Sequence, residues 1–134
     1  MTTANFKHLL HELLRRVELY LAALGAERRC AIRLDRIGDR LLGMGSRIEL
    51  LRERMQVGVV DEPVDDDGAL RTSLKGLKED IRGVRCQLFS MQGPGLSARL
   101  ERAFARLNRI AEETYALADK LQWEIDEHDA RFAS

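Results

Sequence analysis

The feature that most constrains the fold is an unbroken alternation of four- and three-residue steps between apolar side chains in the middle of the chain. It runs through seven positions: Leu70, Leu74, Leu77, Ile81, Val84, Leu88 and Met91. Residues three and four apart lie on one face of an α-helix, so this spacing aligns a single apolar edge of the kind that packed helices share. The pattern predicts a helix over about 69–92, with Asp66 or Asp67 capping its first turn.

The same spacing recurs in the last third of the chain. Ten positions carry it: Leu100, Phe104, Leu107, Ala111, Thr114, Ala118, Leu121, Ile125, His128 and Phe132. A helix over about 96–132 is therefore predicted, with Ser97 as its N-cap. Gly93-Pro94-Gly95 separates the two helical segments and predicts a tight turn over 93–95.

The first segment, about 5–56, is also helical in its periodicity, but its apolar face changes along its length. The apolar positions of its first half include Leu10, Leu14, Val17, Leu21 and Leu24, and those of its second half include Cys30, Ile37, Met44 and Leu51. Either one continuous helix has halves that face different neighbours, or two helices meet at Gly25 as a left-handed C-cap. We favour the continuous helix, because a lone glycine costs only about 1 kcal/mol inside a helix.

The segment 57–68 holds five acidic residues and no basic residue, together with one proline and two glycines, and predicts a solvated loop. The fold class that follows is all-α, in one domain over residues 1–134. We expect an elongated antiparallel bundle with coiled-coil-like packing, built from three long helices, or from four if the first breaks near Gly25. Matching helix levels places Cys30 and Cys86 about 13 Å apart, too far for a disulfide.

The charge balance gives no long-range reason to bind nucleic acid or a membrane, because 22 basic residues offset 22 acidic ones. The longest apolar run, over 19–24, is far shorter than the ~20 residues that a membrane span needs. The first residues show no signal-peptide pattern, and the two cysteines form no zinc or redox motif. These features predict a cytoplasmic protein without membrane contact and without a cofactor.

A continuous first helix predicts an apolar surface that the chain cannot cover. The middle helix reaches back only to about residue 33 of the first, by matching rises of ~1.5 Å per residue. Seven apolar side chains then lack an intrachain partner: Leu9, Leu10, Leu13, Leu14, Val17, Leu21 and Leu24. Exposed apolar surface of that size marks an interface, so a homodimer is expected. Trp123 lies opposite its own helix's apolar edge, and packing inside the bundle or dimer is the favoured explanation for it, with contact to a partner as the alternative.

Two rows of arginine offer an alternative partner. One row comprises Arg29, Arg33, Arg36 and Arg40, and the other comprises Arg99, Arg102, Arg106 and Arg109. Such rows can follow a phosphate backbone, although interleaved carboxylates and few aromatic residues weaken the case. The last helix is basic in its first half and acidic in its second, against the preference set by the helix dipole. Two such helices packed antiparallel would pair their opposite halves and favour a symmetric dimer.

No local pattern supports catalysis. His8 and His11 share one helix face, and His128 has acidic neighbours, but three alternating helices would place the two groups at opposite ends of the molecule. The function that the sequence favours is a non-catalytic helical interaction or adaptor protein, acting as a homodimer. The alternatives are a nucleic-acid-associated regulator that uses the arginine rows and, less supported, a metal-binding protein or enzyme.

Overall fold

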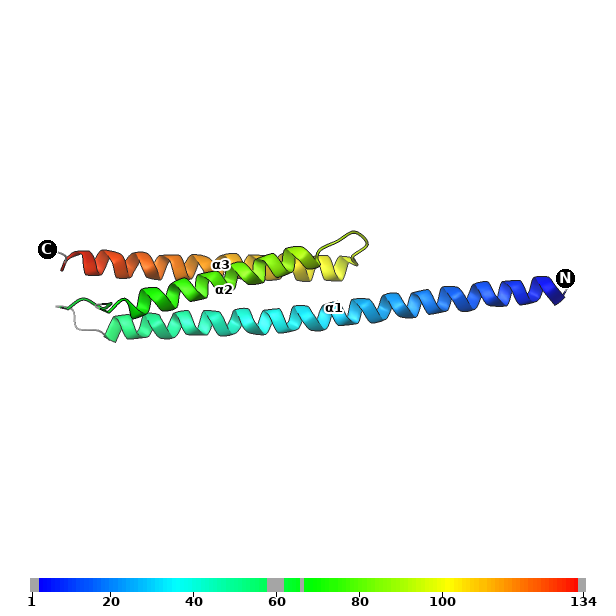
Figure 1. The fold of residues 1–134 in the computed structure, drawn as a ribbon, viewed down its shortest axis with the longest axis horizontal. Helices are drawn as coiled ribbons and strands as arrows, with labels where there is room; N and C mark the ends of the chain where they lie inside the picture. Colours follow the sequence, from blue (N-terminus) through cyan, green and yellow to red (C-terminus); the bar gives the residue numbers. More distant parts are fainter. Residues whose placement is uncertain (1–2, 58–61, 66, 133–134) are drawn as a thin grey trace.

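Three long α-helices form this protein in a computed structural model that describes residues 3–57, 62–65 and 67–132. They are α1 (Thr3–Val57), α2 (Ala69–Met91) and α3 (Ala98–Ala130). Helix α2 runs antiparallel to α1, and α3 turns back to run parallel to α1 (Figure 1). Within the described ranges there is no β-strand. The predicted all-α, elongated antiparallel bundle is confirmed.

One apolar core runs along the line where the three helices meet. Its members are Leu34, Ile37, Leu41, Met44, Ile48 and Leu51 of α1, Leu74, Leu77, Ile81, Val84 and Leu88 of α2, and Leu100, Phe104, Leu107, Ala111, Ala118, Leu121 and Ile125 of α3. In each helix the buried residues recur in alternating steps of three and four. The one polar residue in this series is Thr114, which is buried between Ala111 and Ala118. The Thr114 hydroxyl donates to the carbonyl oxygen of Ile110 at 2.7 Å, which offsets the cost of burying it.

Helix α1 is continuous through Gly25, so the four-helix alternative is wrong. A Cβ placed at Gly25 would meet only the mobile end of Arg29, at 3.5 Å, and the backbone of Gly25 does not adopt a positive φ. Burial in α1 becomes complete only from Leu34 onwards, close to the level expected from helix length. The apolar face therefore changes along one uninterrupted helix.

The N-cap position of α2 is Gly68, which has no side chain, and the N–H groups of the first turn are capped mainly by Asp65, which the sequence did not single out. Its buried carboxylate accepts hydrogen bonds from the backbone N–H groups of Leu70 at 2.7 Å and Arg71 at 3.1 Å. Asp67 accepts one exposed backbone N–H bond at 3.1 Å, and Asp66 lies outside the described residues. The predicted capping role thus belongs mainly to a neighbouring acid.

Helix α3 holds this capping segment in place. The carboxylate of Asp129 accepts the backbone N–H groups of Val64 at 2.8 Å and Asp65 at 3.1 Å. The Arg71 guanidinium donates to Asp65 at 2.9 Å and to Asp126 at 2.7 Å. The hydrogen bond to Asp126 has the largest effect and raises the pKa of Arg71. Burial comes second and lowers this pKa, and the charges of Asp126, Asp65 and Asp129 each raise it by less. The cluster ties the loop between α1 and α2, together with the first turn of α2, to α3.

At the other end of the bundle, the start of α3 is fixed to α1. Ser97 accepts the backbone N–H of Leu100 at 3.3 Å, as predicted for its N-cap, and donates its hydroxyl to Glu27 at 2.7 Å. The preceding turn contains Gly95 at φ 83°, a left-handed conformation that glycine adopts without strain. Cys30 and Cys86 are both free thiols, in line with the expected absence of a disulfide.

Candidate functional site

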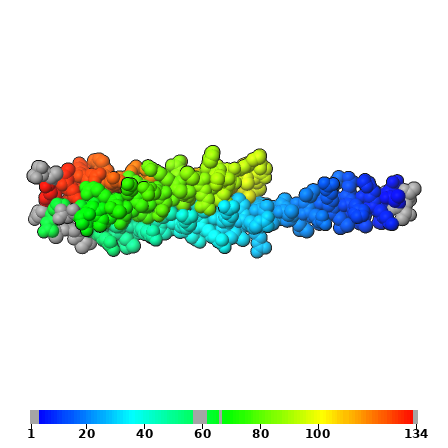
Figure 2. Space-filling model, viewed as in Figure 1, coloured from blue at the N-terminus to red at the C-terminus, as the bar shows by residue number. Residues whose placement is uncertain are grey.

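The first part of α1 projects from the bundle as a single helix (Figures 1 and 2). We call residues 3–26 the overhang, because α3 begins beside α1 at the level of Glu27, where Ser97 bonds to it. The overhang is roughly 36 Å long at ~1.5 Å per residue. In the space-filling view it forms a narrow rod beyond the thicker three-helix body.

The overhang carries a continuous set of exposed large side chains, which we call the apolar face. Its members are Phe6, Leu9, Leu10, Leu13, Leu14, Val17, Tyr20, Leu21 and Leu24, each between 43% and 64% exposed. All seven α1 residues predicted to lack an intrachain partner, from Leu9 to Leu24, are among them. Helices in proteins gain most of their stability by packing an apolar face against other segments. An exposed apolar face of this size is therefore typical of an interaction surface.

The geometry of the apolar face suits contact with another helix. Its central line follows steps of four, three, four and three: Leu10, Leu14, Val17, Leu21 and Leu24. A second line, with a step of seven, runs along one flank: Phe6, Leu13 and Tyr20. The apolar face is therefore wider than the stripe of a strict two-stranded coiled coil, in which only two positions of every seven are apolar.

The apolar face leads into a hollow of about 440 Å³ at the base of the overhang, which we call the notch. From α1 it is lined by Tyr20, Ala23, Leu24, Ala26, Glu27 and Cys30, and from the end of the bundle by Gly95, Leu96, Ser97 and Leu100. Tyr20 and Leu24 belong to the apolar face as well. The exposed face and the end of the bundle core thus form one continuous apolar surface.

Trp123 is not part of this surface. Its side chain is 63% exposed, so it does not pack inside the bundle of a single chain. Trp123 lies about 26 residues along α3 from Ser97, roughly 39 Å from the base of the overhang. Its exposure leaves a partner contact open, but at a place distinct from the apolar face.

The two arginine rows are exposed but do not join into one basic strip. In the first row, Arg40 points toward α2, where its guanidinium lies 3.4 Å from the side-chain oxygen of Gln87. The second row lines the groove between α1 and α3 with Arg99, Arg102 and Arg106, and the same groove contains Asp35 and Asp39. The α3 row therefore faces carboxylates of its own chain.

The acidic half of α3 is also largely matched within the chain. Five acidic residues of α3 form ion pairs with bases of α1 and α2: Glu112 with Arg85, Asp119 with Lys78, Glu124 with Arg52, and Asp126 and Asp129 with Arg71. Most of these pairs are partly exposed and each contributes little alone. The acidic half of α3 therefore has partners within its own chain and needs no second α3 to balance its charge.

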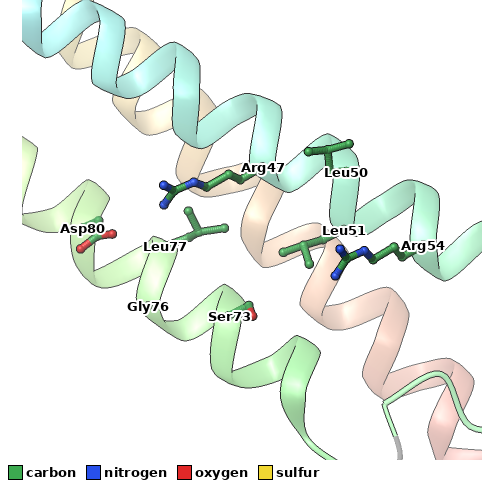
Figure 3. A pocket seen from close by; sticks show the side chains of 8 residues that line it. All are labelled: Arg47, Leu50, Leu51, Arg54, Ser73, Gly76, Leu77 and Asp80. Carbon is green, nitrogen blue, oxygen red and sulfur yellow. The ribbon is translucent and has the colours of Figure 1, made fainter.

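A second hollow, of about 370 Å³, opens between α1 and α2 (Figure 3). Arg47 and Arg54 extend from α1 at its edge, and Leu51 and Leu77 point toward each other between the helices. Asp80 on α2 balances part of the positive charge. This groove is open and has mixed charge.

The histidines do not assemble into a metal site within the described part of the chain. His8 and His11 are exposed on the overhang, whereas His128 lies near the end of α3, with its Nε2 atom 3.1 Å from the carbonyl oxygen of Glu62. The described residues contain no group of three or more histidine, cysteine or acidic side chains placed to hold a metal ion. The predicted separation of the two histidine groups is confirmed.

The chain matches no protein-family model, no curated protein and no solved structure in the comparisons made. None of the described helices contains an apolar stretch long enough to cross a bilayer.

Proposed function

We propose that this chain is a non-catalytic interaction protein that binds through the apolar face of the overhang and forms a homodimer. One observation carries the proposal: nine large apolar side chains lie together on a helix that no other described segment covers. The three-helix body then serves to hold the overhang in a fixed direction, since both belong to the same helix α1.

The size of the apolar face supports a stable contact. Nine roughly half-exposed side chains of this kind present on the order of 700 Å² of apolar surface. The largest apolar patch on an ordinary monomer covers roughly 300–600 Å², and a standard interface buries ~800 Å² on each partner. We propose that the paired overhangs pack as a coiled-coil-like interface in a cytoplasmic setting, which also suits the two free cysteines.

Sedimentation equilibrium at micromolar concentration tests the proposal. The wild-type chain is expected at twice its monomer mass, and the double variant Leu14→Glu/Leu21→Glu at the monomer mass, because two buried carboxylates would lack partners. The matched control is Leu19→Glu, which replaces an exposed leucine on the opposite side of the same overhang and should leave the dimer intact. Circular dichroism should show that all variants remain helical. A wild-type chain that stays monomeric, or equal effects of both substitutions, would contradict the proposal.

The nucleic-acid alternative is tested in the same preparations. Binding through arginine rows would weaken steeply between 50 and 200 mM salt and would be lost in Arg99→Glu/Arg106→Glu. Association through the apolar face should instead change little with salt, because it does not depend on neutralising phosphates. The carboxylates of Asp35 and Asp39 in the α3 groove favour the second outcome.

A further inference from the structure

We infer that the occupant of the apolar face is the overhang of a second copy of this chain in antiparallel orientation, with Phe6 of each chain filling the notch of the other. The inference rests on the proposed function and adds the orientation, the register and a pocket contact. Each notch is then completed by a side chain that its own chain cannot supply.

The position of α3 favours the antiparallel orientation. Leu24 of the apolar face lines the notch together with Leu96 and Leu100, so the face runs directly into the first turn of α3. A second α1 lying parallel on this face would have to continue past Glu27, where α3 and the preceding turn already lie. If the second α1 is antiparallel, its three-helix body lies beyond the N-terminal end of the first overhang and does not meet α3 of the first chain.

The spacing of the apolar face sets the register. Reading the steps of four, three and four from Leu10 to Leu21 in reverse gives the same order, so two antiparallel copies match layer by layer. Leu10 then lies level with Leu21 of the partner subunit, and Leu14 with Val17 of the partner subunit. In the other matching register, Leu10 would face Arg28 of the partner subunit, and the first turn of each helix would press against α3.

This register brings Phe6 to the notch. A twofold axis perpendicular to two antiparallel helices brings the same flank of each together. Phe6 lies on the flank that also carries Leu13 and Tyr20, and the next position in this series of seven is Glu27. Phe6 of the partner subunit would lie level with residue 25, between Tyr20 and Glu27, both of which line the notch.

The notch has a character suited to an aromatic ring. Its walls are mostly apolar, with Tyr20, Leu24, Leu96 and Leu100 among them, and Phe6 itself is 59% exposed in the single chain. An aromatic side chain that enters such a pocket buries a large area and commonly dominates an interface. The pairing is reciprocal, so one dimer contains two identical contacts of this kind.

A double-mutant cycle tests the pocket contact. Phe6 and Leu96 lie roughly 30 Å apart along one chain, so they can be coupled only between chains. We expect Phe6→Ala and Leu96→Ala each to raise the dimer Kd. The increase in the double variant should be smaller than the product of the two single increases, by a factor on the order of ten. The control pairs Phe6→Ala with Phe89→Ala, an exposed aromatic of α2, and should be multiplicative. Multiplicative effects for Phe6 and Leu96 would overturn the pocket contact.

Disulfide trapping tests the orientation. In a Cys30→Ser/Cys86→Ser background, chains with Leu10→Cys mixed with chains with Leu21→Cys should oxidise to a mixed dimer, because these positions share a layer. Leu10→Cys alone should not cross-link, since its two copies lie ~16 Å apart along the axis, beyond disulfide reach. Efficient cross-linking of Leu10→Cys with itself would indicate a parallel pair and overturn the inference, while the proposed function would stand. A monomer in sedimentation would overturn both.

Discussion

The capping carboxylate of Asp65 gives a sharp test of what holds the loop end of the bundle together. The structure places this side chain out of solvent, with two backbone N–H donors of α2 and the Arg71 guanidinium all within 3.1 Å of its oxygens. Asp65→Ala removes all three bonds and leaves the two N–H groups without an acceptor. Loss of a cap costs about 0.5–2 kcal/mol, and loss of a charged partner adds to that cost.

The magnitude is limited because Arg71 keeps other partners. Asp126 still accepts from its Nε atom at 2.7 Å, and Asp129 lies 3.7 Å from its Nη1 atom, so the guanidinium is not left unpaired. We therefore expect Asp65→Ala to lower the free energy of unfolding by about 2–3 kcal/mol, below the ~3–5 kcal/mol typical of a fully buried pair. For a chain of this size the corresponding fall in Tm is about 8–10 °C.

Urea unfolding followed by circular dichroism measures the effect, with wild type and variants at one protein concentration because association contributes to stability. Asp67→Ala is the matched control, since its carboxylate accepts one exposed N–H bond, and it should cost under about 1 kcal/mol. A loss below ~0.5 kcal/mol for Asp65→Ala, or equal losses for both variants, would refute the assignment of Asp65 as the principal cap.

Two further predictions concern single positions in the helices. Gly25→Ala should raise stability by about 0.5–1 kcal/mol in urea unfolding, because alanine fits the continuous helix and the added Cβ meets only Arg29; a loss of helicity would contradict the unbroken α1. Thr114→Val should change the free energy of unfolding by under about 1 kcal/mol, because the hydroxyl bonds only to the Ile110 carbonyl, which keeps its own helical hydrogen bond. A loss above ~2 kcal/mol by the same method would contradict this assignment of the hydroxyl.

The helices and the core were predictable from the sequence because both follow from one local regularity. Alternating steps of three and four predicted α2, α3 and the side chains that they bury, and the absence of strong breaking residues near Gly25 favoured a continuous α1. The exposed apolar face was predictable because the first helix is longer than the helix that packs against it. Its seven predicted members are exposed, although the predicted set of uncovered side chains did not include Phe6 or Tyr20.

Features that depend on distant residues escaped prediction. Asp65 rather than Asp67 became the main cap because Asp129, more than 60 residues away, holds the backbone of Val64 and Asp65. The notch also required knowledge of where Leu96 lies relative to Tyr20. The arginine row of α3 looked free in the sequence, and only the packing of α3 beside α1 brings Asp35 and Asp39 to the same groove.

The unbroken course of α1 has a consequence for the reach of the assembly. A joint at Gly25 would let each three-helix body swing, but a single helix from Thr3 to Val57 fixes its direction relative to the overhang. With two overhangs paired as inferred above, the bodies would point away from each other along a rod roughly 125 Å long. Such a rod is a spacer of set length, which would hold anything attached to its two loop-bearing tips at a constant separation.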